Sequence, residues 1–229
     1  MLSITQDKKK IIAAKKALEF VKDGNIIGIG SGSTVKYFIR FLGEEIRKGN
    51  LREVKGIPSS YDTRILMQKA GIPVTDFIEY PEIDVTVDGA DSVLLEKRIL
   101  IKGGGGAFLR EKIIDYAAKK LVIIVDDSKL NREFPVPIEV LPFALGYVIK
   151  RIETLGARVT FRESKGKVGP CVSDNGNIII DALFDHKDLV PELEIKLNMI
   201  PGVLENGIFN AKCNIIVGLS DKDVKTVVF

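Results

Sequence analysis

Three short glycine-bearing segments carry the residue types that could do chemistry, and each of them follows a predicted strand. They are Gly30-Ser31-Gly32-Ser33-Thr34, Asp88-Gly89-Ala90-Asp91 and Lys102-Gly103-Gly104-Gly105-Gly106. In an open parallel sheet, the loops beyond the carboxyl ends of the strands form the ligand crevice. We therefore expect the three segments to converge on one site.

The first segment is suited to binding a phosphate group. It leads into a predicted helix, whose free N–H groups and positive dipole end favour an anion, with Ser and Thr hydroxyls as further donors. Common nucleotide motifs do not fit, because Ser33 stands where GxGxxG needs glycine and because Lys102 precedes its glycine run, unlike the lysine of GxxxxGK[ST]. A simple tight turn between strand and helix is an equally weighted interpretation of this segment.

The second segment places two carboxylates three residues apart after an apolar strand. Paired carboxylates such as Asp88 and Asp91 suit proton transfer or metal binding. The alternative is that one of them caps a helix while the other is solvated. Further ligands for a hard cation are not evident nearby, and we predict no metal site.

The third segment contains four consecutive glycines, whose conformational entropy is costly to lose on folding. Their presence indicates positive φ or a close backbone approach, the alternative being a flexible loop. Lys102 precedes the run and Glu111 lies on the helix after it, where a carboxylate near a lysine in a partly desolvated crevice can act as a general base. Glu111 taken alone would be interpreted as a surface residue.

Lys129 follows the predicted strand at 121–125. Its positive charge can neutralise a phosphate group, and the alternative is that it is a solvated loop charge.

The hydrophobic pattern of the first half predicts the elements that position these loops. Helices are predicted over 5–23, 61–70 and 107–120 and after residue 34, and strands near 25–30, 54–57, 74–78, 83–87, 98–101 and 121–125. Alternation with fully apolar strands indicates an α/β fold, with a Rossmann-like open parallel sheet and helices on both faces.

The pattern changes after Asp126. A strand bracketed by prolines is followed by a helix at 143–155, strands at 157–163, 171–173 and 178–184, a helix at 188–199 and a strand at 202–209. Apart from the short strand at 171–173, the order is β-α-β-β-α-β, which is typical of a small ferredoxin-like α+β domain. We predict a catalytic Rossmann-like domain at 1–129 and 207–229, whose tail strand CNIIVGL returns to the first sheet, and a small domain at 130–206.

Composition excludes several classes of protein. The 229 residues include 34 basic and 31 acidic side chains, which are interleaved along the chain and argue against a nucleic-acid surface. The N-terminus lacks the apolar core of a signal peptide, and no run reaches about 18 apolar residues, so we expect a cytoplasmic protein without a membrane partner. Cys171 and Cys213 are interpreted as core thiols. The single histidine, His186, leaves almost no room for a Ser-His-Asp triad or a multi-histidine metal site.

Taken together, five motifs resemble those of ribose-5-phosphate isomerase, type A, over about residues 5–229. They are GSGST at 30–34, SSYDTR at 59–64, DGAD at 88–91, KGGGGAFLREKI at 102–113 and DDSK at 126–129. The resemblance implies interconversion of D-ribose 5-phosphate and D-ribulose 5-phosphate through an enediolate, in the pentose phosphate pathway, without metal or organic cofactor. Ser92 stands where relatives often have an acidic residue, which leaves Asp88 and Asp91 in place.

The resemblance also implies roles for individual residues. Glu111 would carry the proton from C2 to C1, Asp88 would assist ring opening and Lys102 would stabilise the developing oxyanion. The implied substrate-binding residues are Ser31, Gly32, Ser33, Thr34, Asp88, Gly89, Ala90, Asp91, Lys102, Gly103, Gly104, Gly105 and Lys129, with Lys10 a further candidate. The implied partner is a small sugar phosphate, and family members are commonly homodimers or homotetramers.

Two other functions are alternatives to this one. In a coenzyme A transferase on a related sheet, Glu111 would be a nucleophile, but the residues around it differ and no adenosine-binding segment is evident. A sugar-phosphate sensor would bind the ligand without turnover, and sensors usually carry a helix-turn-helix. The combination of Asp88, Lys102 and Glu111 favours an enzyme.

Overall fold

The computed structural model describes residues 2–164 and 166–229, and its backbone contacts divide the chain into two compact units. The first unit comprises Met1–Ala90, Arg110–Lys129 and Ala211–Phe229, and the second comprises Asp91–Leu109 and Leu130–Asn210. Residues 91–109 and 207–210 therefore group with the second unit, whereas they were predicted to belong to the first domain.

A six-stranded sheet forms the centre of the first unit, in the order β15-β14-β6-β3-β1-β2. Its strands are β1 (Ile26–Ile29), β2 (Lys55–Pro58), β3 (Val85–Asp88), β6 (Leu121–Asp126), β14 (Asn214–Gly218) and β15 (Val224–Val228). All neighbours are parallel except β14 and β15. The return of the tail strand to this sheet is confirmed, and β15 is an edge strand that the sequence analysis did not predict.

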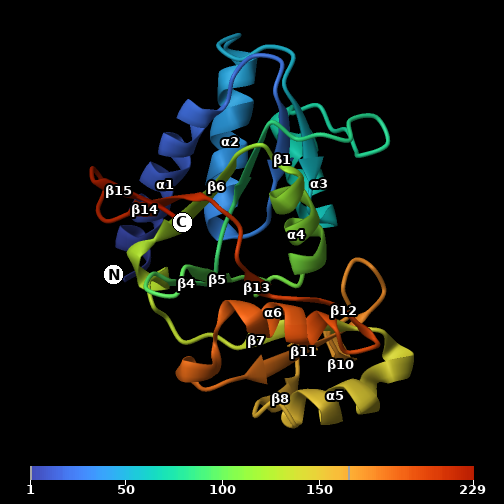
Figure 1. Ribbon diagram of the computed structural model, residues 1–229. Coiled ribbons are helices and arrows are strands. Elements are labelled where there is room, and N and C mark those ends of the chain that lie inside the picture. The colour runs from blue at the N-terminus through green and yellow to red at the C-terminus, as the bar shows by residue number, and fades with distance from the viewer. Residues whose placement is uncertain (1, 165) are drawn as a thin grey trace. The chain divides into compact units, whose positions relative to one another are not determined.

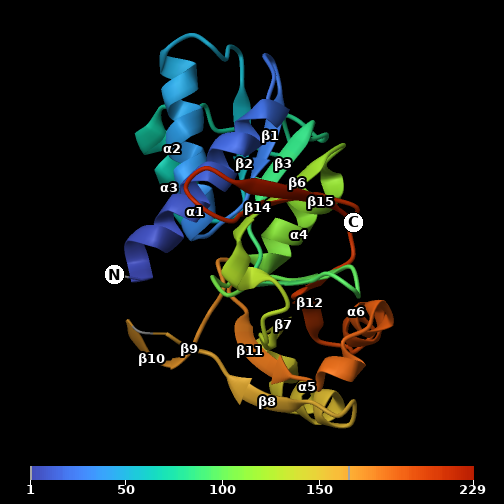
Figure 2. The same ribbon diagram turned by 90° about the vertical axis from the view of Figure 1, so that its left-hand side faces the viewer.

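Helices cover both faces of this sheet, as the apolar strands predicted (Figures 1 and 2). They are α1 (Leu2–Ala17), which continues as a 3₁₀ turn over Leu18–Phe20, α2 (Ser33–Arg47), α3 (Tyr61–Ala70) and α4 (Phe108–Ala117). Ile27 and Ile29 of β1 point into a core shared with α1, α2 and α3, while Ile26 packs on the other face with Ile114 of α4. This alternation explains why β1 is apolar at every position.

The strand expected at 74–78 does not form. Val74 makes only a single parallel bridge to Gly56, and residues 77 and 78 lie in a turn. Asp76 accounts for that turn, because its Oδ1 accepts hydrogen bonds from the N–H groups of Ile78 and Glu79 at 2.9 and 3.2 Å. A side chain that binds its own backbone in this way competes with strand pairing.

The strand predicted at 98–101 forms, but it does not join the parallel sheet. β4 (Ser92–Leu94), β5 (Ile99–Ile101) and β13 (Ile208–Phe209) make a separate three-stranded antiparallel sheet in the second unit. Only residues 89–91 link β3 to β4, and a parallel neighbour needs a crossover of about a dozen residues or more. The short link therefore excludes parallel pairing at this point.

The rest of the second unit has the predicted ferredoxin-like order. Its four-stranded antiparallel sheet, β12-β7-β11-β8, carries two helices. The elements are β7 (Val136–Val140), α5 (Leu145–Glu153), β8 (Arg158–Phe161), β11 (Ile178–Leu183), α6 (Pro191–Asn198) and β12 (Val203–Asn206). A small ribbon of β9 (Glu163–Ser164) and β10 (Lys167–Pro170) precedes β11, and the strand expected at 171–173 is reduced to one bridge from Val172 to Ile178.

The two cysteines differ in exposure, and the single histidine lies at the surface. Cys213 is a buried thiol as expected, whereas Cys171 is free and only partly buried, since it follows the exposed β10 ribbon. His186 is exposed. Within residues 2–164 and 166–229, every helix is too short or too polar to span a membrane.

Gly28 marks the closest approach between β1 and β3, where it pairs with Thr86. A Cβ at residue 28 would lie 2.2 Å from Oγ1 of Thr86, which donates to the carbonyl of Ile114 at 2.8 Å. We expect Gly28→Ala to lower the free energy of unfolding by about 1–3 kcal/mol, measured by urea denaturation, because overpacking must displace this strand pair. Gly146→Ala is the control, because a Cβ there meets nothing within 4 Å; equal stability of the two variants would contradict the argument.

Candidate functional site

The loop after β1 is shaped by glycine and opens α2. Gly32 has a φ of 114° and occupies the N-cap position, so that Ser33 and Thr34 begin the helix. Gly30 lies against Asp88, whose carboxyl carbon would be 1.8 Å from a Cβ at residue 30. The positive φ and the close approach both require glycine in this loop.

Ser31 connects this loop to the start of α3. Its Oγ lies 2.8 Å from Oγ of Ser59, 2.9 Å from Oγ of Ser60 and 3.1 Å from Oγ1 of Thr63. Ser60 also caps α3 by accepting the N–H of Thr63 at 3.1 Å. These three hydroxyls were not among the predicted site residues, although Ser59 and Ser60 lie just after a predicted strand, as Ser31 does.

Asp88 ends β3 and is completely buried, so it is not the solvated or capping carboxylate of the alternative interpretation. Its Oδ1 accepts hydrogen bonds from the N–H groups of Gly89 at 2.6 Å and Ser31 at 3.2 Å. These bonds bring the first two glycine-bearing segments together, as predicted. They also fix the carboxylate at the carboxyl end of β1, which lies between β2 and β3 in the sheet. In open parallel sheets, ligands usually bind at such a point, where successive connections run to opposite sides of one strand.

Glu111, Lys129 and Lys10 are further predicted site residues of the first unit. Glu111 lies in the first turn of α4 and is 5% exposed, which contradicts the interpretation as a surface residue. Lys129 ends the 3₁₀ turn Asp127–Lys129 after β6 and is partly buried. Since β6 is parallel to β3, this turn lies at the same sheet edge as Asp88. Lys10, the further candidate, lies on α1 with its Nζ 3.9 Å from Asp7.

In the second unit, Asp91 meets the glycine run. Its Oδ2 accepts the N–H of Gly104 at 2.6 Å, and a Cβ on Gly104 would lie 2.6 Å from Oδ1. Gly103 has a φ of 104° and packs on the Phe108 ring. The predicted need for positive φ and close approach is confirmed for these glycines, and Asp91 links the second segment to the third.

Lys102 is 1% exposed, which is unusual for a lysine. It follows β5, and its N–H donates to the carbonyl of Gly207 at 2.9 Å. Its Nζ lies 5.0 Å from the centre of the Phe209 ring, a cation–π distance. Burial against β13 therefore holds this ammonium group in a desolvated position.

Arg162, which directly follows β8 in the second unit, is hydrogen-bonded to the glycine run. Its Nη1 donates to the carbonyl of Gly103 at 2.5 Å, and its guanidinium is paired with Asp181 through Nε at 2.9 Å and through Nη2. This pair was not predicted, because Arg162 and Asp181 lie far from the glycine run in the sequence and nothing local connects them to it. The pair limits the freedom of a segment that four glycines would otherwise leave mobile.

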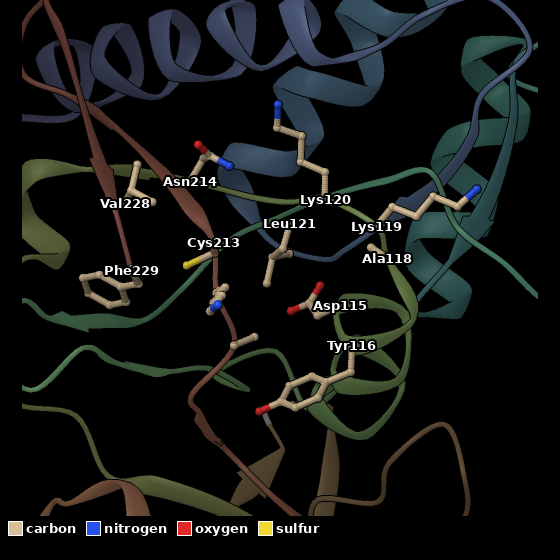
Figure 3. A pocket seen from close by; sticks show the side chains of 12 residues that line it. Asp115, Tyr116, Ala118, Lys119, Lys120, Leu121, Cys213, Asn214, Val228 and Phe229 are labelled. Atoms are coloured by element: carbon tan, nitrogen blue, oxygen red, sulfur yellow. The ribbon is translucent and has the colours of Figure 1, made fainter.

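A cavity of about 470 Å³ lies at the opposite edge of the first unit's sheet, where β6 and β14 begin (Figure 3). It is lined by the end of α4, by Lys119, Lys120 and Lys212, and by the last residues of the chain. None of the residues predicted for the site lines it. In the described part of the chain, no three His, Cys, Asp or Glu side chains cluster to hold a metal ion.

These features define an α/β protein with buried carboxylates and hydroxyl donors at the carboxyl edge of a parallel sheet, an arrangement suited to a small phosphorylated ligand. The family model of ribose 5-phosphate isomerase A (phosphoriboisomerase A) matches residues 55–222. This chain belongs to the ribose 5-phosphate isomerase A family.

Several relatives are similar over nearly the whole chain. Ribose-5-phosphate isomerase A of Archaeoglobus fulgidus is 50% identical over 205 residues, which are 88% of this chain and 90% of the relative. The solved structure of the Methanocaldococcus jannaschii enzyme has a TM-score of 0.93 and 43% identity, covering 98% of this chain and 100% of that one. A D-ribose-5-phosphate isomerase in complex with phospho-erythronic acid has a TM-score of 0.90 and 42% identity, covering 98% and 99%.

Proposed function

We propose that this chain interconverts D-ribose 5-phosphate and D-ribulose 5-phosphate by moving a proton between C2 and C1 through an enediolate. The observation that carries the proposal is the burial of Asp88, Lys102 and Glu111, which are 0%, 1% and 5% exposed, because charged side chains withdrawn from solvent in this way are typical of functional sites. Membership of the family and the phospho-erythronic acid complex of a relative support the same substrate class.

In the aldose-to-ketose direction, Asp88 assists opening of the furanose ring, which frees the aldehyde at C1. The Glu111 carboxylate then takes the proton from C2, and the electron pair moves through the new C1–C2 double bond to the oxygen on C1. Lys102 stabilises the negative charge that develops on oxygen. The proton of the C2 hydroxyl passes to the negatively charged oxygen on C1, the C2 oxygen becomes the ketone as the double bond's electron pair takes the proton from Glu111 at C1, and the catalytic carboxylate is regenerated.

The remaining site residues bind the substrate. Ser31, Gly32, Ser33 and Thr34 present hydroxyl and N–H donors at the start of α2, and Lys129 supplies a positive charge at the same edge. Asp91 binds substrate hydroxyls, and Gly89, Ala90 and Gly103–Gly105 supply backbone contacts. We further propose that the enzyme is a cytoplasmic homodimer or homotetramer of the pentose phosphate pathway that needs neither metal nor organic cofactor.

The proposal is tested with EDTA-treated protein and ribose 5-phosphate in D₂O. We expect ketose to form with solvent deuterium at C1, because a proton held on Glu111 in an enediolate intermediate exchanges with solvent. Activity lost to EDTA and restored only by a divalent cation would contradict the metal-free reaction. Binding of ribose 5-phosphate without any ketose would instead indicate a sensor.

A further inference from the structure

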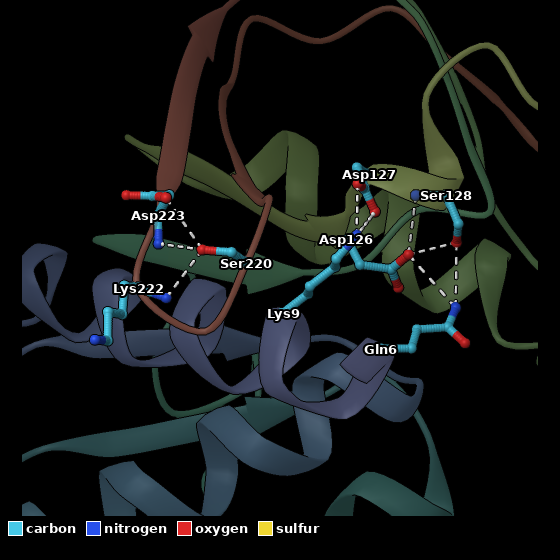
Figure 4. Close-up of polar contacts among 8 residues, drawn as sticks. All are labelled: Gln6, Lys9, Asp126, Asp127, Ser128, Ser220, Lys222 and Asp223. Atoms are coloured by element: carbon cyan, nitrogen blue, oxygen red, sulfur yellow. Dashed lines mark hydrogen bonds and ion pairs between the residues drawn. The ribbon is translucent and has the colours of Figure 1, made fainter. Parts of the chain in front are cut away.

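The turn that carries Lys129 is fastened to α1 by an ion pair. Nζ of Lys9 lies 2.8 Å from Oδ1 and 2.7 Å from Oδ2 of Asp127, so both carboxylate oxygens are engaged (Figure 4). The two side chains are only 21% and 37% exposed. A two-point contact with limited solvent access restricts the carboxylate more than the usual exposed ion pair does.

A second contact from α1 reaches the residues on either side of Asp127. Nε2 of Gln6 donates to Oγ of Ser128 at 3.2 Å and approaches Oδ1 of Asp126 at 3.5 Å (Figure 4). The same Asp126 oxygen accepts the N–H of Ser128 at 3.0 Å. Helix α1 thus contacts the three consecutive residues that precede Lys129.

Helix α1 is itself fixed on the sheet at the level of Lys9. A Cβ on Gly218 would lie 2.0 Å from the carbonyl oxygen of Lys9, so the helix backbone rests directly on β14. Gly218 is in turn paired with Asp126 in the neighbouring strand β6. The base of the Lys9 side chain and the start of the turn therefore belong to one tightly packed part of the first unit.

We propose that Lys9 and Asp127 are positioning residues that hold the 126–129 turn so that the Lys129 ammonium group stays directed to the substrate phosphate. This inference rests on the proposed function, in which Lys129 binds that phosphate. The phosphate does not react, so its contacts are equally strong in the ground state and the transition state. Loss of the ion pair should therefore raise KM and leave kcat nearly unchanged.

The test compares Lys9→Met and Asp127→Asn with a charge-reversed chain that combines Lys9→Asp with Asp127→Lys. We expect each single variant to raise KM for ribose 5-phosphate about fivefold, as for loss of one well-formed ion pair, and the reversed pair to recover most of that loss. Lys8→Met is the matched control, because Lys8 is the neighbouring residue but its Nζ is 3.8 Å from Asp221, with both side chains about half exposed. It removes the same charge without touching the turn, and its KM should stay within about twofold of the parent value.

Lys129→Met separates this inference from the proposed function. If Lys129→Met raises KM but Lys9→Met and Asp127→Asn do no more than Lys8→Met, the positioning role is wrong while phosphate binding by Lys129 stands. If Lys129→Met leaves KM unchanged, the binding role of Lys129 and the inference built on it both fail. A fall in kcat as large as the rise in KM would also overturn the positioning role, because it would indicate general damage to the site.

Discussion

Glu111→Gln is expected to lower kcat by roughly 10²–10⁴-fold while ribose 5-phosphate still binds. The amide has the shape of the carboxylate but cannot accept the C2 proton. At 5% exposure, Glu111 leaves little room for water to replace it as the base. Ketose formation measures kcat, and calorimetric titration of the variant with ribose 5-phosphate measures binding.

Glu19→Gln is the control for this variant, because it removes a carboxylate that is 62% exposed in the same unit. Its kcat should equal that of the parent enzyme. Two results would count against a general base at residue 111: unchanged turnover in Glu111→Gln, or loss of binding together with turnover. A chain that binds the sugar phosphate equally before and after the change and never turns it over would be a sensor.

The parallel sheet was predictable because burial on both faces produces a recognisable pattern of apolar residues in the sequence. Strands buried on both faces, such as Leu121–Asp126, are apolar at nearly every position, and helical stripes separate them. In the sheet of β4, β5 and β13, the strand β5 was predicted but its pairing was not, because the strands are two or three residues long and one partner comes from more than 100 residues away. Edge strand β15 was missed for a related reason, since its exposed side needs no apolar residues.

The site was predictable where it consists of contiguous loops at strand ends. Asp88 and Ser31 belong to such loops, and the contact between them follows from the neighbouring positions of β1 and β3. Arg162 holds the glycine run by bonding to a backbone carbonyl, which leaves no mark on the sequence of that run. The same is true of Lys9, whose partner Asp127 is 118 residues away in the chain. Supporting contacts of this kind become visible only after the chain has folded.

Gly30→Ala is expected to lower kcat/KM about a hundredfold or more, because a displacement of about 1 Å in a catalytic group can cost that much. The new Cβ would lie 1.8 Å from both Cγ and Oδ1 of Asp88. Asp88 is completely buried, so its carboxylate has no solvent to turn into. It must give up its bonds from the N–H groups of Ser31 and Gly89, or β1 must move away from β3. Either change removes the geometry that the proposed role of Asp88 in ring opening requires.

Gly28→Ala separates this local effect from a general loss of stability. Residue 28 is two positions earlier, within β1, and its Cβ would meet Oγ1 of Thr86 at 2.2 Å, a similar overlap with the same neighbouring strand β3. Thr86 is not among the residues proposed to act on the substrate, so the folded fraction of Gly28→Ala should keep kcat/KM within a few-fold of the parent value while Gly30→Ala does not. Urea denaturation measures the folded fraction of each variant, and ketose formation measures its activity. Equal losses of kcat/KM per folded molecule would mean that strand separation, and not displacement of the Asp88 carboxylate, limits the reaction.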